Sequence, residues 1–116
     1  MTHRDLEVWK MSMALVEKVY TFAKNMPDEE KYGLTSQLKR SAISIPSNIA
    51  EGAARGTTKE FIRFLDIATG SLSELETQLE LTQRLSYIKN SEILIDEIET
   101  ISKMLYKLKK SLKSKL

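Results

Sequence analysis

The chain of 116 residues contains no cysteine, one histidine, two prolines and four glycines. Without cysteine it forms no disulfide and offers no thiolate. The single histidine, His3, lies outside the helices predicted below, which excludes the Glu-x-x-His pairs of a dimetal bundle, zinc sites and catalytic triads. No glycine-rich phosphate-binding motif is present. We therefore expect no metal, no cofactor and no catalytic residue, and a protein that is not an enzyme.

Long hydrophobic runs are also missing. The longest uninterrupted apolar segment is "MALV", residues 13–16, which is far shorter than a membrane span. The first ten residues, "MTHRDLEVWK", lack the apolar segment of a signal peptide. The sequence predicts a cytoplasmic protein that makes no membrane contact.

Apolar residues recur at alternating spacings of three and four over four segments, and no strand pattern competes with them. The segments predict helices at about residues 5–25, 34–54, 59–85 and 91–113. Gly56 suits the end of the second helix, and Thr57 with Glu60 suits a capping box at the start of the third. With short loops between them, these helices predict one domain, residues 1–116, an all-α antiparallel up-down-up-down four-helix bundle.

The first helix carries two apolar rows, which together cover more than half of its circumference. One row consists of Leu6, Trp9, Met13, Val16, Tyr20 and Ala23. The other contains Val8, Met11, Leu15, Val19, Phe22 and Met26. A small bundle needs a narrower stripe, so we expect subunit packing at Val8, Met11, Leu15, Val19 and Phe22. Deep packing within one chain is the alternative.

The second helix holds Pro46 and a row of polar residues at helical spacing, namely Gln37, Ser41, Ser44, Asn48, Glu51 and Arg55. Solvated faces normally carry long charged side chains, so these small polar groups suggest a seam packed against helices of the same or another subunit. Serines near Pro46 can also bond to local backbone. The alternative is a surface for a ligand or nucleic acid built on Asn48, Glu51 and Arg55. In the third helix, Gly70 predicts the close approach of another helix.

The net charge of +2 hides an uneven distribution. Residues 66–99 carry eight acids and two bases, whereas residues 103–116 carry six lysines and no acid. Two groups of bases are candidates for binding nucleic acid. They are Arg55, Lys59 and Arg63, around the connection between the second and third predicted helices, and Lys103, Lys107, Lys109, Lys110 and Lys113 on the last helix. Lysines at a helix C-terminus also serve simply as solvated partners of the helix dipole.

The segment "QLKRSAISIPSNIAEGAARGTTKEFIRFLDIATGSLSELETQL", flanked by "DLEVWKMSMALVEKVY" and "PDEEKYGLTSQ", resembles the bacterial 23S rRNA intervening-sequence protein family. The likeness covers almost the whole chain. The matching positions are Gln37, Arg40, Ser44, Asn48, Glu51, Gly52, Arg55, Gly70, Ser71 and Glu74. The resemblance implies a four-helix bundle that assembles as a homopentamer. It also implies similarity to the accessory protein of diversity-generating retroelements, which binds nucleic acid, and it assigns no catalytic role.

Two functional hypotheses follow. The first is a non-enzymatic homo-oligomer that binds ribosomal or other structured RNA, or DNA, through its basic surfaces. The second is a protein-interaction scaffold without direct nucleic-acid contact, since the acidic span of residues 66–99 suits a basic protein partner.

Overall fold

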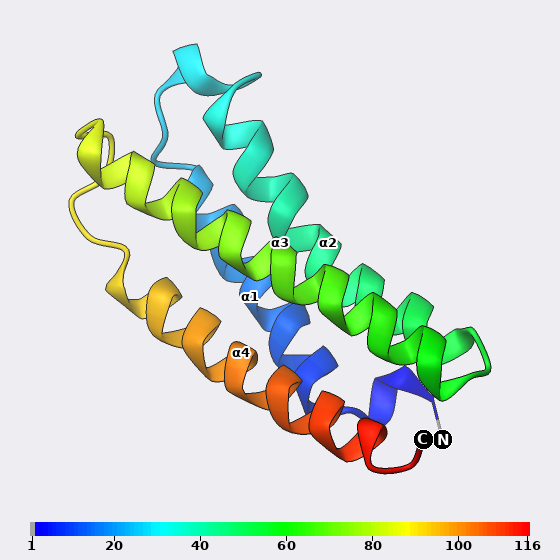
Figure 1. Ribbon diagram of the computed structural model, residues 1–116. Coiled ribbons are helices and arrows are strands. Elements are labelled where there is room, and N and C mark those ends of the chain that lie inside the picture. The colour runs from blue at the N-terminus through cyan, green and yellow to red at the C-terminus, as the bar shows by residue number, and fades with distance from the viewer. Residues whose placement is uncertain (1) are drawn as a thin grey trace.

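Four helices run alternately up and down the molecule, namely α1 (Glu7–Ala23), α2 (Leu34–Ala54), α3 (Thr58–Arg84) and α4 (Glu92–Lys113) (Figure 1). The structure is a computed structural model that describes residues 2–116. Two short 3-10 helices, η1 (His3–Asp5) and η2 (Asp28–Glu30), precede α1 and α2. Helix α2 packs on α1 and α3, and α4 packs on α3 and α1, so α2 and α4 lie diagonally opposite. The predicted all-α antiparallel four-helix bundle is confirmed, and the helix bounds lie within two residues of those predicted.

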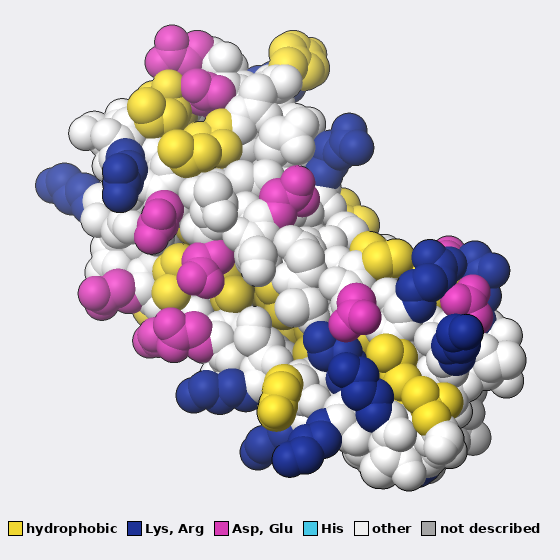
Figure 2. Space-filling view, in the orientation of Figure 1, with side chains coloured by type: hydrophobic (Ala, Val, Ile, Leu, Met, Phe, Trp, Pro, Cys, Tyr) yellow, Lys and Arg dark blue, Asp and Glu magenta, His cyan; other side chains and the backbone are white. Residues whose placement is uncertain are grey.

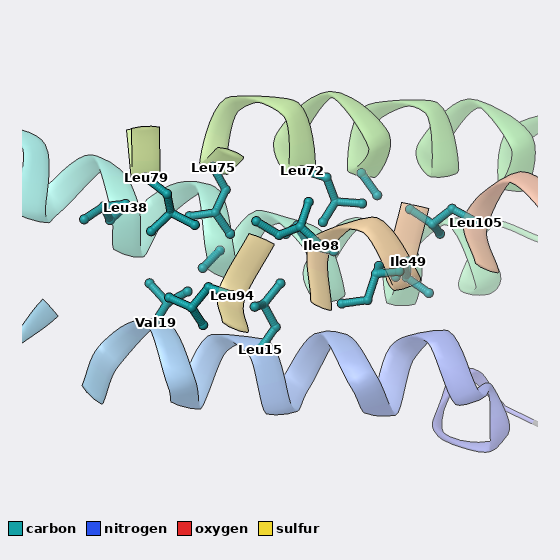
Figure 3. Packing of buried hydrophobic residues seen from close by; sticks show 14 of the residues in the cluster. Leu15, Val19, Leu38, Ile49, Leu72, Leu75, Leu79, Leu94, Ile98 and Leu105 are labelled. Atoms are coloured by element: carbon teal, nitrogen blue, oxygen red, sulfur yellow. The ribbon is translucent and has the colours of Figure 1, made fainter. Parts of the chain in front are cut away.

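Leucine and isoleucine from all four helices fill the centre of the bundle (Figure 3). The residues without measurable exposure include Leu15, Leu38, Ile45, Ile49, Leu65, Leu75, Leu79, Ile101 and Leu105. Within α2, α3 and α4 successive members of this set are four, seven or ten apart, which places them on one side of each helix. Burial of these side chains is the main favourable term in folding the chain.

The two apolar rows of α1 have different surroundings. Val8, Leu15 and Val19 are buried in the core of the chain itself, and Met11 and Phe22 pack against that core. This corrects the expectation for Val8, Leu15 and Val19, whose surface is already buried within the chain. Met11 and Phe22 are only partly buried, and their contact with another subunit stays a prediction. The other row is the more open one, with Met13 44% and Tyr20 39% exposed.

The ends of the helices are held by side chains from the connecting segments. The Glu30 carboxylate of η2 accepts the Leu34 N–H at 3.0 Å and caps α2, where Gly33 has no side chain to do so. Gly56 follows α2 with φ +87°, the left-handed conformation expected of a glycine after a helix. Thr57 Oγ1 accepts the Glu60 N–H at 3.1 Å, which is one half of the capping box predicted for the start of α3, whereas the Glu60 carboxylate accepts from Arg63.

Helices α2 and α3 approach each other closely at Gly52. A Cβ at this position would lie 2.7 Å from the Phe64 Cβ and 3.3 Å from the Phe61 carbonyl oxygen, so only glycine fits. The close approach expected at Gly70 is absent within residues 2–116, since nothing lies within 4 Å of the corresponding point. Helix α2 therefore accommodates its neighbour with one glycine, and the glycine in α3 faces outward.

Candidate nucleic-acid interface

The middle of the polar row of α2 faces α3 of the same chain. The Ser41 hydroxyl lies 2.6 Å from Gln78 Oε1, and both residues are buried. One turn further on, the Ser44 and Ser71 hydroxyls lie 2.8 Å apart. Asn48 Nδ2 donates to the Ser44 carbonyl at 2.7 Å. These contacts make a polar seam between two helices that approach closely, because buried hydroxyls and amides need partners.

The two ends of the same row lie on the surface. Gln37, Glu51 and Arg55 are exposed, and the last two form an ion pair at 3.5 Å between Arg55 Nη2 and Glu51 Oε2. Pro46 is buried inside α2, and the helix continues through it from Leu34 to Ala54. The Ser44 hydroxyl forms its bond across the helix interface with Ser71 of α3, and it also accepts from Asn48 Nδ2 one turn along α2. This serine therefore joins two helices as well as two turns of α2.

The pair Ser41–Gln78 gives a test of this seam. Ser41→Ala is expected to lower the free energy of unfolding by about 1 kcal/mol, because the buried Gln78 carbonyl loses its donor. The double variant with Gln78→Leu should recover most of that loss, since both polar partners are then gone. Urea unfolding of the wild type, both single variants and the double variant closes the cycle. Strictly additive losses would show that the two side chains do not interact.

The first basic group, at the turn between α2 and α3, is largely neutralised. Arg55 pairs with Glu51, and Arg63 Nε donates to Glu60 Oε2 at 2.8 Å. Both guanidinium groups also lie over the ring of Phe64, at 4.9 and 4.5 Å from its centre. The two arginines thus cover the ring of Phe64 and connect the end of α2 to the start of α3 through cation–π contacts. Lys59 is exposed and makes no ion pair in residues 2–116. Since the two arginines are paired with acids, this group offers little net positive charge to a polyanion.

The second basic group, on α4, divides into two parts. Lys109 is a structural residue, because its ammonium donates to Asp66 Oδ1 at 3.1 Å and to Thr69 Oγ1 at 3.3 Å, joining α4 to α3. Lys103, Lys107 and Lys110 are exposed and make no ion pair among residues 2–116. We call these three residues the lysine strip. Lys113, one turn beyond it, is also exposed.

The lysine strip borders a hollow of about 420 Å³ whose other lining residues are Ser102 and Tyr106. The exposed side of α4 changes sign along its length, from acids in the first half to lysines in the second (Figure 2). Tyr106, which sequence reasoning missed, is 64% exposed. The sequence did contain a pattern that could have indicated it. Lysines stand three residues before Tyr106 and one and four residues after it, and no acid occurs from residue 103 onward.

The perturbed pKa values have structural causes. The Leu34 N–H and then the Tyr87 hydroxyl donate to the Glu30 carboxylate and hold its pKa below the usual value. The hydrogen bond from the Tyr87 hydroxyl to Glu30 raises the pKa of Tyr87. The hydrogen bond from Arg63 likewise lowers the pKa of Glu60. Each shift thus belongs to a helix cap or a surface ion pair, and these groups lie away from the hollow on α4.

Residues 2–116 contain no cluster of three or more His, Cys, Asp or Glu side chains that could bind a metal ion. His3 sits in η1 with its ring edge-on to Trp9 at 5.0 Å, where it packs against the start of α1. Among the described helices, none is both long and apolar enough to cross a membrane.

Comparison with known proteins places this arrangement in a family. The family model described as 23S rRNA-intervening sequence protein matches residues 4–107, from η1 through the lysine at 107. The chain belongs to this family. A crystal structure of a protein of unknown function from the S23 ribosomal protein family of Bacteroides thetaiotaomicron is similar to it, with 29% sequence identity and a TM-score of 0.65. That likeness covers 92% of this chain and 95% of the other. No protein of curated function matches the sequence.

As a member of the 23S rRNA-intervening sequence protein family, the chain shares its fold with this solved relative. The match spans α1 to α3 and continues along α4 as far as Lys107, so it includes the polar seam between α2 and α3 and two of the three residues of the lysine strip.

Proposed function

We propose that this protein is a non-enzymatic homo-oligomer that binds ribosomal or other structured RNA through α4. The observation that carries the proposal is the lysine strip, Lys103, Lys107 and Lys110, exposed on one face and without acidic partners in residues 2–116. Unpaired lysines on one helix face attract phosphates, whose counterions are released on binding. Lys110 lies in the last turn of α4, where the helix dipole also favours a base, but Lys103 and Lys107 lie further inside the helix, beyond the reach of that effect.

Self-association is proposed to use a second surface. Met13 and Tyr20 of α1 and Ile43 of α2, which we call the α1–α2 apolar strip, are each about 40% exposed. They lie on adjoining helices. The ammonium group of Lys39, which is one turn before Ile43 on α2, lies 4.9 Å from the centre of the Tyr20 ring on α1. Partly exposed apolar groups on neighbouring helices are typical of protein interfaces.

The assembly we propose is a homopentamer, the number that the family resemblance implies. A ring would repeat the lysine strip around its axis, and several weak phosphate contacts would then act together on one RNA. This repetition compensates for the modest net charge of +2 on each chain.

The lysine strip is tested by fluorescence anisotropy with a labelled ribosomal-RNA hairpin, titrated from low to physiological salt. The triple change Lys103→Gln, Lys107→Gln and Lys110→Gln is expected to reduce the log–log salt slope by about two to three, since each lost phosphate contact removes roughly 0.7–0.9. The control is Lys24→Gln, Lys31→Gln and Lys89→Gln, which removes the same charge from exposed positions near the opposite end of the bundle.

Equal effects of the two triple variants would show that only net charge matters. An absence of binding at low salt would overturn the proposal and favour the protein-interaction scaffold. Light scattering of the wild type measures the subunit number in the same samples, and a monomer would overturn the self-association.

A further inference from the structure

Tyr106 differs from the other tyrosines in what its ring meets. Tyr20 and Tyr32 each lie beneath a lysine ammonium, and Tyr87 donates its hydroxyl to a carboxylate. Within residues 2–116, Tyr106 makes no cation–π contact, no aromatic pair and no side-chain hydrogen bond. With 64% of its surface exposed, it leaves an aromatic face open to solvent in the second half of α4.

The surroundings of Tyr106 carry charge of one sign. Lys103, Lys107 and Lys110 lie three residues before it and one and four residues after it, on the outer side of α4. Together with Ser102 they line the hollow of about 420 Å³ that the ring borders. Residues three and four apart on a helix stand about 5–6 Å from each other, so the flexible lysine side chains can reach phosphates on both sides of a group held at the ring.

We propose that Tyr106 is a stacking platform for an unpaired base of RNA, with the lysine strip binding the flanking phosphates. This inference rests on the proposed function and names the kind of nucleotide that the surface takes. A base in a duplex has its faces covered by its neighbours, whereas an unpaired base in a loop or single strand has a face free for an aromatic ring. Stacking on an aromatic ring next to cationic side chains is the usual way that proteins hold such bases.

A two-fold contact with a second copy of the chain is unfavourable at this surface. A two-fold contact through Tyr106 would bring two lysine strips together, and like charges without acids between them repel. The α1–α2 apolar strip avoids this conflict, because α2 lies diagonally opposite α4 in the bundle. In a ring, each chain contacts its neighbour through two different surfaces, and the α1–α2 apolar strip is proposed as one of them. A contact of Tyr106 with the neighbouring chain is therefore one of the outcomes that the test below distinguishes.

The test compares the affinity for a labelled oligouridine with the affinity for an RNA duplex of the same length, by anisotropy at one fixed low salt concentration. The wild type is expected to prefer the unpaired strand. Tyr106→Ala should weaken binding of the strand by about 5- to 150-fold, the range that loss of one base-stacking aromatic gives. Tyr106→Phe, which keeps the ring, should bind like the wild type. Neither variant should change duplex binding, since the lysine contacts remain.

Other outcomes separate this inference from the proposed function. If strand and duplex bind equally well and Tyr106→Ala changes neither, the stacking platform is wrong while RNA binding by the lysine strip stands. If neither RNA binds, both proposals fail. Displacement of the strand by polyglutamate at equal charge would show that the surface reads charge alone. A lower mass of Tyr106→Ala by light scattering would make Tyr106 a subunit contact instead.

Discussion

Leu15→Ala is expected to lower the free energy of unfolding by about 2–5 kcal/mol, the range for buried leucines cut back to alanine. Leu15 has no exposed surface and lies in the core that α1 shares with the other helices (Figure 3). Removing its side chain leaves a cavity that the surrounding helices can only partly fill. The loss should appear in urea unfolding followed by far-UV circular dichroism, and it should persist when the protein is diluted.

The matched control for Leu15 is Met13→Ala, two residues earlier on the same helix. Met13 is 44% exposed, and changes at exposed positions usually alter the stability of a chain by no more than about 0.5 kcal/mol. Because Met13 belongs to the proposed α1–α2 apolar strip, its effect should show as a dependence on protein concentration and a lower mass by light scattering. Equal losses at Leu15 and Met13, both independent of concentration, would contradict the assignment of the two rows of α1.

Gly52→Ala is expected to destabilise the bundle by about 2 kcal/mol, although alanine is the better helix former by about 1 kcal/mol. The added Cβ would lie 2.7 Å from the Phe64 Cβ, an atom that the backbone of α3 holds in place. Helices α2 and α3 would have to move apart, and the hydrogen bond between Ser41 and Gln78 would lengthen with them. Thermal or urea unfolding gives the loss directly.

Gly70→Ala provides the opposite result on the neighbouring helix. Nothing lies within 4 Å of a Cβ built there, so alanine should raise the free energy of unfolding by about 0.5–1 kcal/mol. A stable Gly52→Ala variant would show that α2 and α3 do not approach so closely. A destabilised Gly70→Ala variant, or one with a lower mass, would show that another subunit packs on the outer face of α3.

The proposed functions occupy separate parts of the bundle, which makes them separable by mutation. The α1–α2 apolar strip serves self-association, and the lysine strip with Tyr106 serves RNA on the diagonally opposite helix. Changes in the first should reduce the mass and, through lost multivalency, the RNA affinity. Changes in the second should reduce RNA affinity while the mass stays constant. A chain whose RNA affinity and mass always fall together would have a single shared surface.

The sequence by itself determined the helices and their class of packing. Apolar spacing of three and four, the break at Gly33 and the glycine at 56 are local signals, because they depend on helix geometry and backbone freedom alone. These signals predicted every helix to within two residues and the antiparallel bundle that follows from short loops. The resemblance of the segment around Pro46 likewise led to the family that the comparison then showed.

Only the tertiary structure decided which groups face which neighbours. Both apolar rows of α1 combine spacings of three and four, and the rotation that buries Leu15 and exposes Met13 is set by packing against α2 and α4. The close approach falls at Gly52 and leaves Gly70 open, because the contact point depends on how two helices cross. In the same way, partners distant in sequence neutralise Lys109 while the lysine strip beside Tyr106 stays free among residues 2–116. Such pairings are long-range contacts, so the local periodicity that predicts a helix carries no information about them.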